Sequence, residues 1–182
     1  MLSSPYHNCA IFGKYLYFYN SFYYNSGRKW YNVVKGGNHM FIGEYHHNLD
    51  GKGRIIIPVK FRELFSNKVI VSKGFDGCLN VYTLSKWQEV LESLAKLPNT
   101  KIESRQYKHM ITAKATECEL DNQGRILLPA PLIAEATLEK ACILVGAVDH
   151  VEIWAQERWE SYYDQAQANF EEVAEKLTDF LI

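Results

Sequence analysis

A ten-residue motif that occurs twice constrains the fold of this chain more than any other feature. Residues 49–58 read LDGKGRIIIP, and 71 residues later residues 120–129 read LDNQGRILLP. The likeness continues past the motif, where Gly74, Val81, Tyr82 and Trp87 correspond to Gly146, Ile153, Trp154 and Trp159. Two copies are too few for a solenoid, which needs at least three units to build a continuous core. We therefore expect a closed pair of units, each burying its apolar face against the other.

Each motif combines turn chemistry with a β-branched strand. Asp50 can bond the backbone ahead of it, and Gly51 and Gly53 permit a positive φ. Residues 54–57 then read as a strand that stops at Pro58, and residues 125–128 form the equivalent strand. Short helices are expected over 59–65 and 130–136, followed by strand pairs at 68–72 with 78–82 and at 141–145 with 151–154. Each motif thus places an arginine, Arg54 or Arg125, at a strand start beside an exposed turn.

Three further helices are expected outside the duplicated motifs. Ser85 and Gln88 have capping-box spacing, which predicts a helix that begins at Ser85 and ends before Pro98. A second helix is expected over 102–111, and residues 156–181 carry apolar side chains at three- and four-residue steps. That C-terminal stripe needs a partner, which is either its own barrel or a neighbouring subunit.

Composition describes a soluble globular chain, and we expect no cofactor. It has 182 residues, 47% of them hydrophobic and 23% charged, with a net charge of −1, and no apolar run approaches the ~20 residues that span a bilayer. The four cysteines are scattered without a CxxC pair, which favours buried thiols in a reducing cytosol. His46 and His47 point to opposite faces of a strand, so we expect one half-buried and one exposed imidazole instead of a metal site.

The first 39 residues differ from the rest of the chain. They hold eleven aromatic residues, four basic residues and no Asp or Glu, and they lack the order of a secretory signal. An interfacial aromatic anchor is one interpretation, although no helical stripe is visible. We favour another, in which residues 1–39 are a non-native, disordered upstream extension and Met40 is the true start, because Lys35-Gly36-Gly37 can be encoded by a purine-rich bacterial ribosome-binding sequence. Intact-mass measurement of native protein would test this interpretation.

Charge divides the chain more sharply than its total suggests. Residues 44–116 carry twelve Lys or Arg against seven Asp or Glu, whereas residues 117–154 carry two against seven and the tail has the same ratio. A nucleic-acid surface should therefore centre on the first unit, with Lys52, Arg54, Lys60 and Arg62 as its contributors. At the matching positions the second unit has Gln123, Arg125, Pro131 and Ile133. We accordingly expect Arg54 to matter more than Arg125.

These residues resemble the MraZ family of bacterial transcriptional regulators. The resemblance lies in MFIGEYHHNLDGKGRIIIPVKFR, the GFDGCL turn, ATECELDNQGRILLP and the closing VEIW, and it runs from Met40 to near the C-terminus. It implies an α+β fold, a swapped-hairpin β-barrel of the AbrB/MazE type built as a pseudo-dimer within one chain, with peripheral helices and a C-terminal helix. On that basis residues 40–98 form the first unit with its following helix, and residues 99–182 form the second unit with a linking helix and the C-terminal helix.

The resemblance also implies a function. It predicts a sequence-specific DNA-binding regulator, cytoplasmic and associated with the nucleoid, that acts on the promoter of its own division and cell-wall gene cluster. It further predicts a ring-like homo-oligomer that reads direct repeats in double-stranded DNA, with no membrane partner or small-molecule substrate. DNA binding falls on the Asp-x-x-x-Arg pattern, with the DNA-contacting candidates Arg54, Arg125, Lys52, Lys60, Arg62 and Gln123.

The remaining motif residues have a supporting role, and two other functions are alternatives. Asp50 and Asp121 are expected to fix the turn and orient their arginines, because carboxylates repel the phosphate backbone; Gly51, Gly53 and Gly124 let the turn approach DNA closely. An enzyme finds little support, since the chain has no P-loop, dinucleotide fingerprint or catalytic set. A protein-binding module such as an antitoxin-like barrel shares the fold, and salt-dependent DNA binding would separate it from a regulator.

Overall fold

The computed structural model describes residues 9–12, 15–18, 21–23 and 40–177. The chain divides into two compact units, residues 1–39 and 40–182. In the first, the strands β1 (Cys9–Phe12), β2 (Tyr15–Phe18) and β3 (Ser21–Tyr23) form an antiparallel sheet in that order. These strands lie in the segment that we expected to be disordered, and the proposed start region before Met40 lies outside the described residues.

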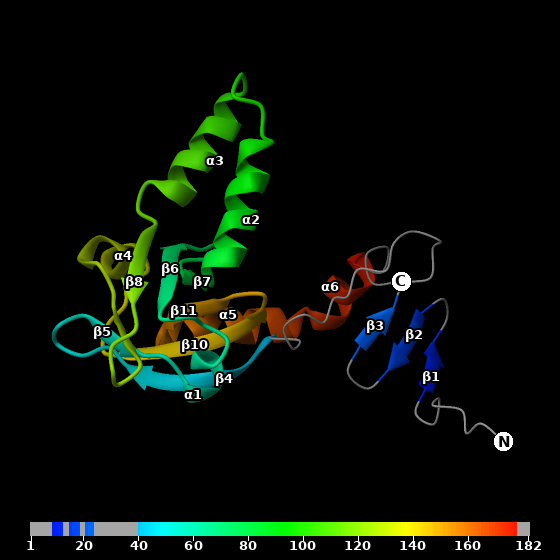
Figure 1. Ribbon diagram of the computed structural model, residues 1–182, viewed down its shortest axis with the longest axis horizontal. Coiled ribbons are helices and arrows are strands. Elements are labelled where there is room, and N and C mark those ends of the chain that lie inside the picture. The colour runs from blue at the N-terminus through cyan, green and yellow to red at the C-terminus, as the bar shows by residue number, and fades with distance from the viewer. Residues whose placement is uncertain (1–8, 13–14, 19–20, 24–39, 178–182) are drawn as a thin grey trace. The chain divides into compact units, whose positions relative to one another are not determined.

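The second unit contains both copies of the motif in an α+β arrangement (Figure 1). Its first half comprises β4 (Phe41–Asn48), β5 (Arg54–Ile56), α1 (Val59–Arg62), β6 (Lys68–Lys73) and β7 (Leu79–Tyr82). The helices α2 (Leu84–Ala95) and α3 (Ile102–Thr112) follow. The second half comprises β8 (Thr116–Glu119), β9 (Arg125–Leu127), α4 (Ala130–Glu135), β10 (Ala141–Val148) and β11 (Val151–Ala155). The chain continues into α5 (Gln156–Ala168) and α6 (Phe170–Lys176).

The two halves exchange strands. The main sheet has the order β4-β10-β11-β7-β6-β8, so the first strand of each half pairs with the hairpin of the other half. The two hairpins meet where β11 pairs antiparallel with β7. Every pairing in this sheet is antiparallel. Neither half could therefore complete its part of the sheet without the other.

A second, two-stranded ribbon joins the duplicated motifs themselves. β5 and β9 pair antiparallel, with Ile55 opposite Ile126 at the centre. β4 and β8 are the outer strands of the six-stranded sheet, and across residues 40–177 no backbone pairing joins them. The described strands thus form an open sheet and a ribbon, and closure into a barrel is not confirmed.

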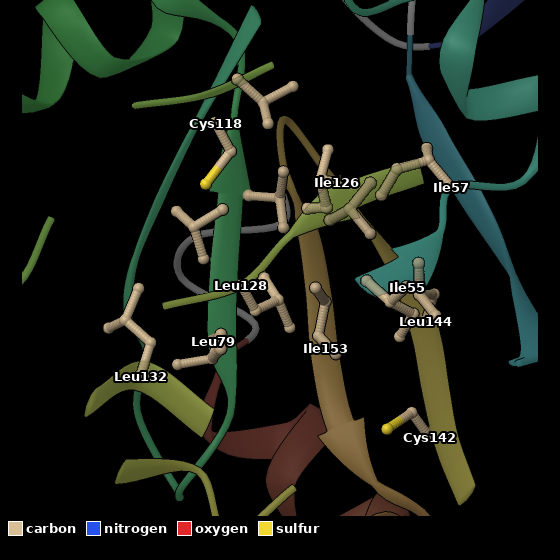
Figure 2. Packing of buried hydrophobic residues seen from close by; sticks show 14 of the residues in the cluster. Ile55, Ile57, Leu79, Cys118, Ile126, Leu128, Leu132, Cys142, Leu144 and Ile153 are labelled. Atoms are coloured by element: carbon tan, nitrogen blue, oxygen red, sulfur yellow. The ribbon is translucent and has the colours of Figure 1, made fainter. Parts of the chain in front are cut away.

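The core lies between the two halves and draws side chains from both. Ile55 and Ile57 from the first motif and Ile126 and Leu128 from the second are almost fully buried. Figure 2 shows them together with Leu144 and Ile153 of the second hairpin. Such burial is worth roughly 1.5–3 kcal/mol for each large aliphatic side chain. The mutual burial expected from the duplication is therefore present.

The helices depart from the sequence predictions at their ends. The N-cap of α2 is Thr83, whose Oγ1 accepts from the Lys86 amide at 3.1 Å, so the capping box predicted at Ser85 is wrong by two residues. α1 ends at Arg62, earlier than predicted. α2 and α3 form a hairpin that contacts β6 (Figure 1). None of the described helices is long and apolar enough to cross a membrane.

The C-terminal stripe is interrupted at Asn169, between α5 and α6. Its first part packs on the sheet of its own chain, because Trp154 on β11 lies 5.4 Å from the Trp159 ring and 5.0 Å from the Tyr162 ring. The Trp159 indole also donates to Glu44 of β4 at 3.0 Å. The second part of the stripe, at α6, leaves the apolar side chains of Phe170, Val173 and Leu177 exposed.

Candidate nucleic-acid interface

The two Asp-x-x-x-Arg turns have nearly the same backbone. In the first, the Gly53 amide donates to Asp50 O and the Asp50 amide donates to Arg54 O, both at 2.9 Å. In the second, the corresponding bonds at Asp121 measure 2.8 and 2.9 Å. Gly53 and Gly124 have φ values of +78° and +71°. This is the pattern of a four-residue turn that ends in a left-handed glycine, as in hairpins with a G1 bulge.

The aspartate of each turn holds both the turn and the arginine. Asp50 Oδ1 accepts from the Lys52 and Arg54 amides at 2.8 and 2.9 Å, and Oδ2 accepts from Arg54 Nε at 2.7 Å. Arg54 Nη2 lies 2.6 Å from the same Oδ2. The Arg54 hydrogen bond is the largest cause that lowers the pKa of Asp50 to about 2. Asp50 is therefore ionised at neutral pH and fixes the guanidinium in one orientation.

Asp121 repeats this geometry in the second turn. Its Oδ1 accepts from the Gln123 and Arg125 amides, both at 2.9 Å, and its Oδ2 lies 2.8 Å from Arg125 Nε and 2.7 Å from Nη2. The Arg125 hydrogen bond likewise lowers the pKa of Asp121 to about 2. These are the contacts that the predicted orienting role of the two aspartates requires.

Each arginine keeps an unused edge of its guanidinium. A guanidinium carries five N–H groups, and the carboxylate takes those on Nε and one side of Nη2, which leaves the Nη1 side and the other Nη2 proton. The side chains of Arg54 and Arg125 are 30% and 23% exposed, so they are less open than the turn positions had predicted. They are half-buried groups with one edge available to a ligand.

The β5–β9 ribbon brings the two arginines onto one surface. Arg54 lies opposite Leu127, and Arg125 lies opposite Ile56, on either side of the central Ile55–Ile126 pair. Because directly opposed residues in an antiparallel pair point to the same face, the buried central pair places these four side chains on the outer face. The surface carries one arginine and one aliphatic side chain at each end.

Each turn is completed by the helix of the other half. The Arg62 side chain of α1 donates from Nε to Ile57 O at 2.6 Å, and its guanidinium lies where a Cβ on Gly124 would stand. At the matching position on α4, Ile133 Cδ1 lies 3.0 Å from a Cβ placed on Gly53. The backbone crosses in the same way, since the Ile57 amide donates to Gly124 O at 2.9 Å and the Leu128 amide to Gly53 O at 2.8 Å.

This crossing separates the DNA-contacting candidates that the sequence had placed together. Lys52 and Gln123 are exposed in their own turns, and Lys60 is exposed on α1. Arg62 does not lie with Lys52 on the first turn; it covers the second. Gly51 lacks a positive φ, and a Cβ added there would have no neighbour within 4 Å, so the predicted conformational need for glycine applies at Gly53 and Gly124 only.

The neighbours of the two turns also differ in charge. A hollow beside the first turn is lined by Lys52, Gly53, Leu127 and strand β8, which contributes Glu117 and Glu119. Lys68 holds these carboxylates at 2.6 and 3.4 Å. Near the second turn, the pKa of His47 is lowered by burial and then by the charge of Arg62. Acidic side chains thus border the first turn and a cation covers the second.

Sequence reasoning missed this cross-half role of Arg62. The register of the duplication aligns Arg62 with Ile133, but it cannot say which turn either side chain covers. Strand exchange alone decides that contact.

The histidines and cysteines considered as metal ligands lie at separate positions in the described part of the fold. His46 is exposed and His47 half-buried, as predicted. Cys78, Cys118 and Cys142 are buried free thiols, and burial raises the pKa of Cys78 to about 12 and of Cys118 to about 11. Among the residues that the structure describes, no group of three His, Cys, Asp or Glu could hold a metal ion.

Comparison with known proteins accounts for both halves. The family model for the MraZ protein, described as antitoxin-like, matches residues 40–110 and again residues 111–181. A "Transcriptional regulator MraZ" from Ligilactobacillus salivarius is 45% identical over 141 residues, which cover 78% of this chain and 99% of the relative. Relatives of the same name from Desulforamulus reducens and Moorella thermoacetica are both 47% identical, over 78% of this chain and 100% and 99% of their own lengths. The chain belongs to the MraZ family.

Proposed function

We propose that this protein is a sequence-specific DNA-binding transcriptional regulator and not an enzyme. The observation that carries the proposal is the pair of carboxylate-oriented arginines on one ribbon surface, Arg54 and Arg125. The names of the three relatives, all transcriptional regulators, agree with it. With such a role the protein acts in the cytoplasm at the nucleoid.

The chemistry of base reading fits the free edge of each guanidinium. Arginine makes two hydrogen bonds to O6 and N7 of guanine in the major groove, worth ~1–3 kcal/mol of discrimination. A two-stranded ribbon is among the elements that the major groove admits. Lys52, Lys60 and Gln123 would hold phosphates, which position the ribbon without reading sequence. Arg62, already bonded to Ile57 O, would add charge at the second turn.

We further propose that the strand-exchanged sheet and ribbon act as a swapped-hairpin barrel of the AbrB/MazE type. The pairing of each first strand with the opposite hairpin supports this arrangement.

The two ends of the ribbon are alike in their arginines and different in their neighbours, so one chain reads DNA with a direction. If chains join head to tail in a ring, neighbours present the same surface in the same sense, and the matching operator is a direct repeat. Several chains bound together would strengthen weak single-box binding. By the family resemblance, the operator lies in the promoter of the protein's own gene cluster.

A second candidate function follows from the description of the family as antitoxin-like. In that case the same fold would neutralise a protein partner. The two functions differ in their response to salt. Binding to DNA releases counterions from the phosphate backbone, so the affinity for DNA falls steeply as the salt concentration rises.

The test is a footprint of purified protein on the DNA upstream of its own gene, with affinity measured across a salt series. We expect tandem protected boxes spaced by roughly one helical turn, ~10–10.5 base pairs. Reversing one box at fixed sequence and spacing should reduce affinity nearly to the single-box level. Replacing Arg54 or Arg125 with alanine should weaken this binding, and Lys96→Ala, which removes an exposed charge at the end of α2, is the matched control for the loss of a cation. Salt-independent or undetectable DNA binding would overturn the proposal.

A further inference from the structure

Two aliphatic side chains lie exposed on the ribbon surface. Ile56 is 38% exposed and Leu127 is 57% exposed, whereas their strand neighbours Ile55 and Ile126 are fully buried. They occupy the same position in the two motifs. Single exposed apolar residues are common on protein surfaces. Here, however, each one lies directly across the ribbon from an oriented arginine.

We propose that Ile56 and Leu127 are specificity-determining residues that contact the C5-methyl group of thymine beside the guanine bound by the paired arginine. The proposal rests on the DNA-binding function proposed above. The methyl group of thymine is the one apolar feature that a base pair presents in the major groove, and apolar side chains recognise it by contact. Leu127 would act with Arg54, and Ile56 with Arg125.

The register of the ribbon sets the distance between the two contacts. Opposed residues in an antiparallel pair have their Cβ atoms ~4.5–5.5 Å apart, whereas successive bases along a strand rise about 3.4 Å. The Cβ separation exceeds the rise of one base pair and is less than the rise of two. An arginine and the aliphatic residue across from it can therefore contact neighbouring base pairs. Because Asp50 and Asp121 hold their guanidinium groups in place, the aliphatic side chains cannot move far along the groove independently of them.

Charge decides which occupant this apolar surface takes. Leu127 lies opposite Arg54 in the ribbon, and it lines a hollow together with Lys52 and the acidic residues Glu117 and Glu119, which Lys68 pairs. Ile56 lies opposite Arg125, which belongs to the second turn that Arg62 covers. Arg54 and Arg125 are already paired with their turn aspartates, so the cations without a carboxylate partner near this surface are Lys52 and Arg62. An apolar protein partner would offer these two cations no counter-charge, whereas a DNA groove brings phosphates on both sides. The surface thus fits DNA better than a second copy of the chain.

The experiment uses duplexes selected from a random pool by the purified full chain. Each thymine of the selected sequence is replaced in turn by deoxyuridine, which removes the methyl group and leaves base pairing intact. We expect about fourfold weaker binding at one thymine for each ribbon end, as for the loss of one buried methyl. Leu127→Ala should abolish the sensitivity at one of these thymines, and Ile56→Ala the sensitivity at the other. Ile102→Ala, which removes an aliphatic side chain 55% exposed at the start of α3, is the matched control.

The possible results separate this inference from the proposed function. Absence of selectable DNA would overturn the regulator itself. Binding that depends on salt and on Arg54, yet is equally strong for thymine and deoxyuridine, would overturn the methyl contact alone. If Leu127→Ala changes the oligomeric state and leaves the thymine sensitivity intact, the apolar surface contacts another copy and the inference is wrong. Unchanged thermal unfolding of both variants would show that their effects do not arise from misfolding.

Discussion

The turn at Asp50 and the turn at Asp121 have the same internal structure and different surroundings. Their hydrogen bonds agree to within 0.1 Å, and both aspartates have a pKa of about 2. Outside the turn, one glycine is covered by Ile133 and the other by the cation of Arg62. Duplication therefore preserves the hydrogen bonds that form within a short motif. The contacts that distinguish the two copies come from the opposite half of the chain.

The difference between the turns also revises the expected ranking of the two arginines. By sequence, the positive charge belongs to the first unit, which favoured Arg54. In the structure, Arg62 of that unit lies on the second turn, and the acidic strand β8 borders the first. The cations of the first half are therefore shared between the two turns.

The largest expected effect is on DNA affinity. Arg54→Ala and Arg125→Ala should each cost ~1–3 kcal/mol of specific binding, and the double variant about 2–6 kcal/mol. Because Arg62 supports the second turn, we expect the two single losses to lie close together. Titration of a selected duplex at fixed salt measures them, and unfolding curves serve as the control. A loss confined to Arg54→Ala would restore the sequence-based ranking.

The next effect concerns stability and compares three glycines. Gly124→Ala should destabilise most, since a left-handed alanine costs ~1–2 kcal/mol and the new Cβ would displace Arg62 from Ile57 O, a bond worth ~1 kcal/mol. Gly53→Ala shares the first cost and meets Ile133, so it should follow closely. Gly51→Ala is the control, because its φ is ordinary and its surroundings are open. Denaturant unfolding measures all three. Equal stability of the Gly124 and Gly51 variants would contradict the assigned strain.

A smaller effect should show that Arg62 acts on the second turn. Arg62→Met keeps the aliphatic stem and removes the charge, and we expect the salt slope of DNA binding to fall by about 1. The loss should be non-additive with Arg125→Ala and additive with Arg54→Ala, because residues that contact a common element are coupled. Lys60→Met on the same helix is the matched control and should be additive with both. Coupling to Arg54 instead would reverse the assignment.

The smallest effect compares the two hairpin turns and depends on pH. His150, between β10 and β11, lies 2.6 Å from Asp149 and 3.5 Å from Glu152, and the corresponding β6–β7 turn, residues 74–78, has no histidine. Burial opposes protonation of His150, but hydrogen bonds to Glu152 and Asp149 outweigh it and raise its pKa above 6.5. The stabilisation is complete below pH 6.5 and is lost as the pH rises through the raised value.

This loss should amount to less than about 1 kcal/mol, because the ion pairs are partly exposed. His150→Gln removes it, so the difference in unfolding free energy between wild type and variant should shrink between pH 6 and 8. Using the difference cancels the opposite contribution of His47, whose pKa is lowered. A difference that is constant with pH would show that His150 does not titrate in this network.

Local features of the fold could be predicted from sequence, and contacts between halves could not. The turn, the strand start at Arg54 and the short helix at Val59 follow from residue types within a few positions. The N-cap was misplaced because Thr83 and Ser85 are both good caps, and the choice depends on where β7 ends. The break at Asn169 interrupts a stripe whose apolar spacing continues unchanged. The position of Arg62 over Gly124 has no local cause, since it depends on strands paired across the two halves.

The exchange of strands also fixes when this chain can become ordered during its synthesis. The buried Phe41 belongs to β4, which pairs with β10. Its partner residue Val148 is synthesised about a hundred residues later. At ~5–20 residues per second, the ribosome would leave β4 unpaired for roughly 5–20 s, with its backbone groups and apolar side chains open to aggregation. Pairing over such a sequence separation is also slow, because the loop must close before the contact stabilises it. We therefore expect the nascent first half to be bound by chaperones that hold extended apolar segments.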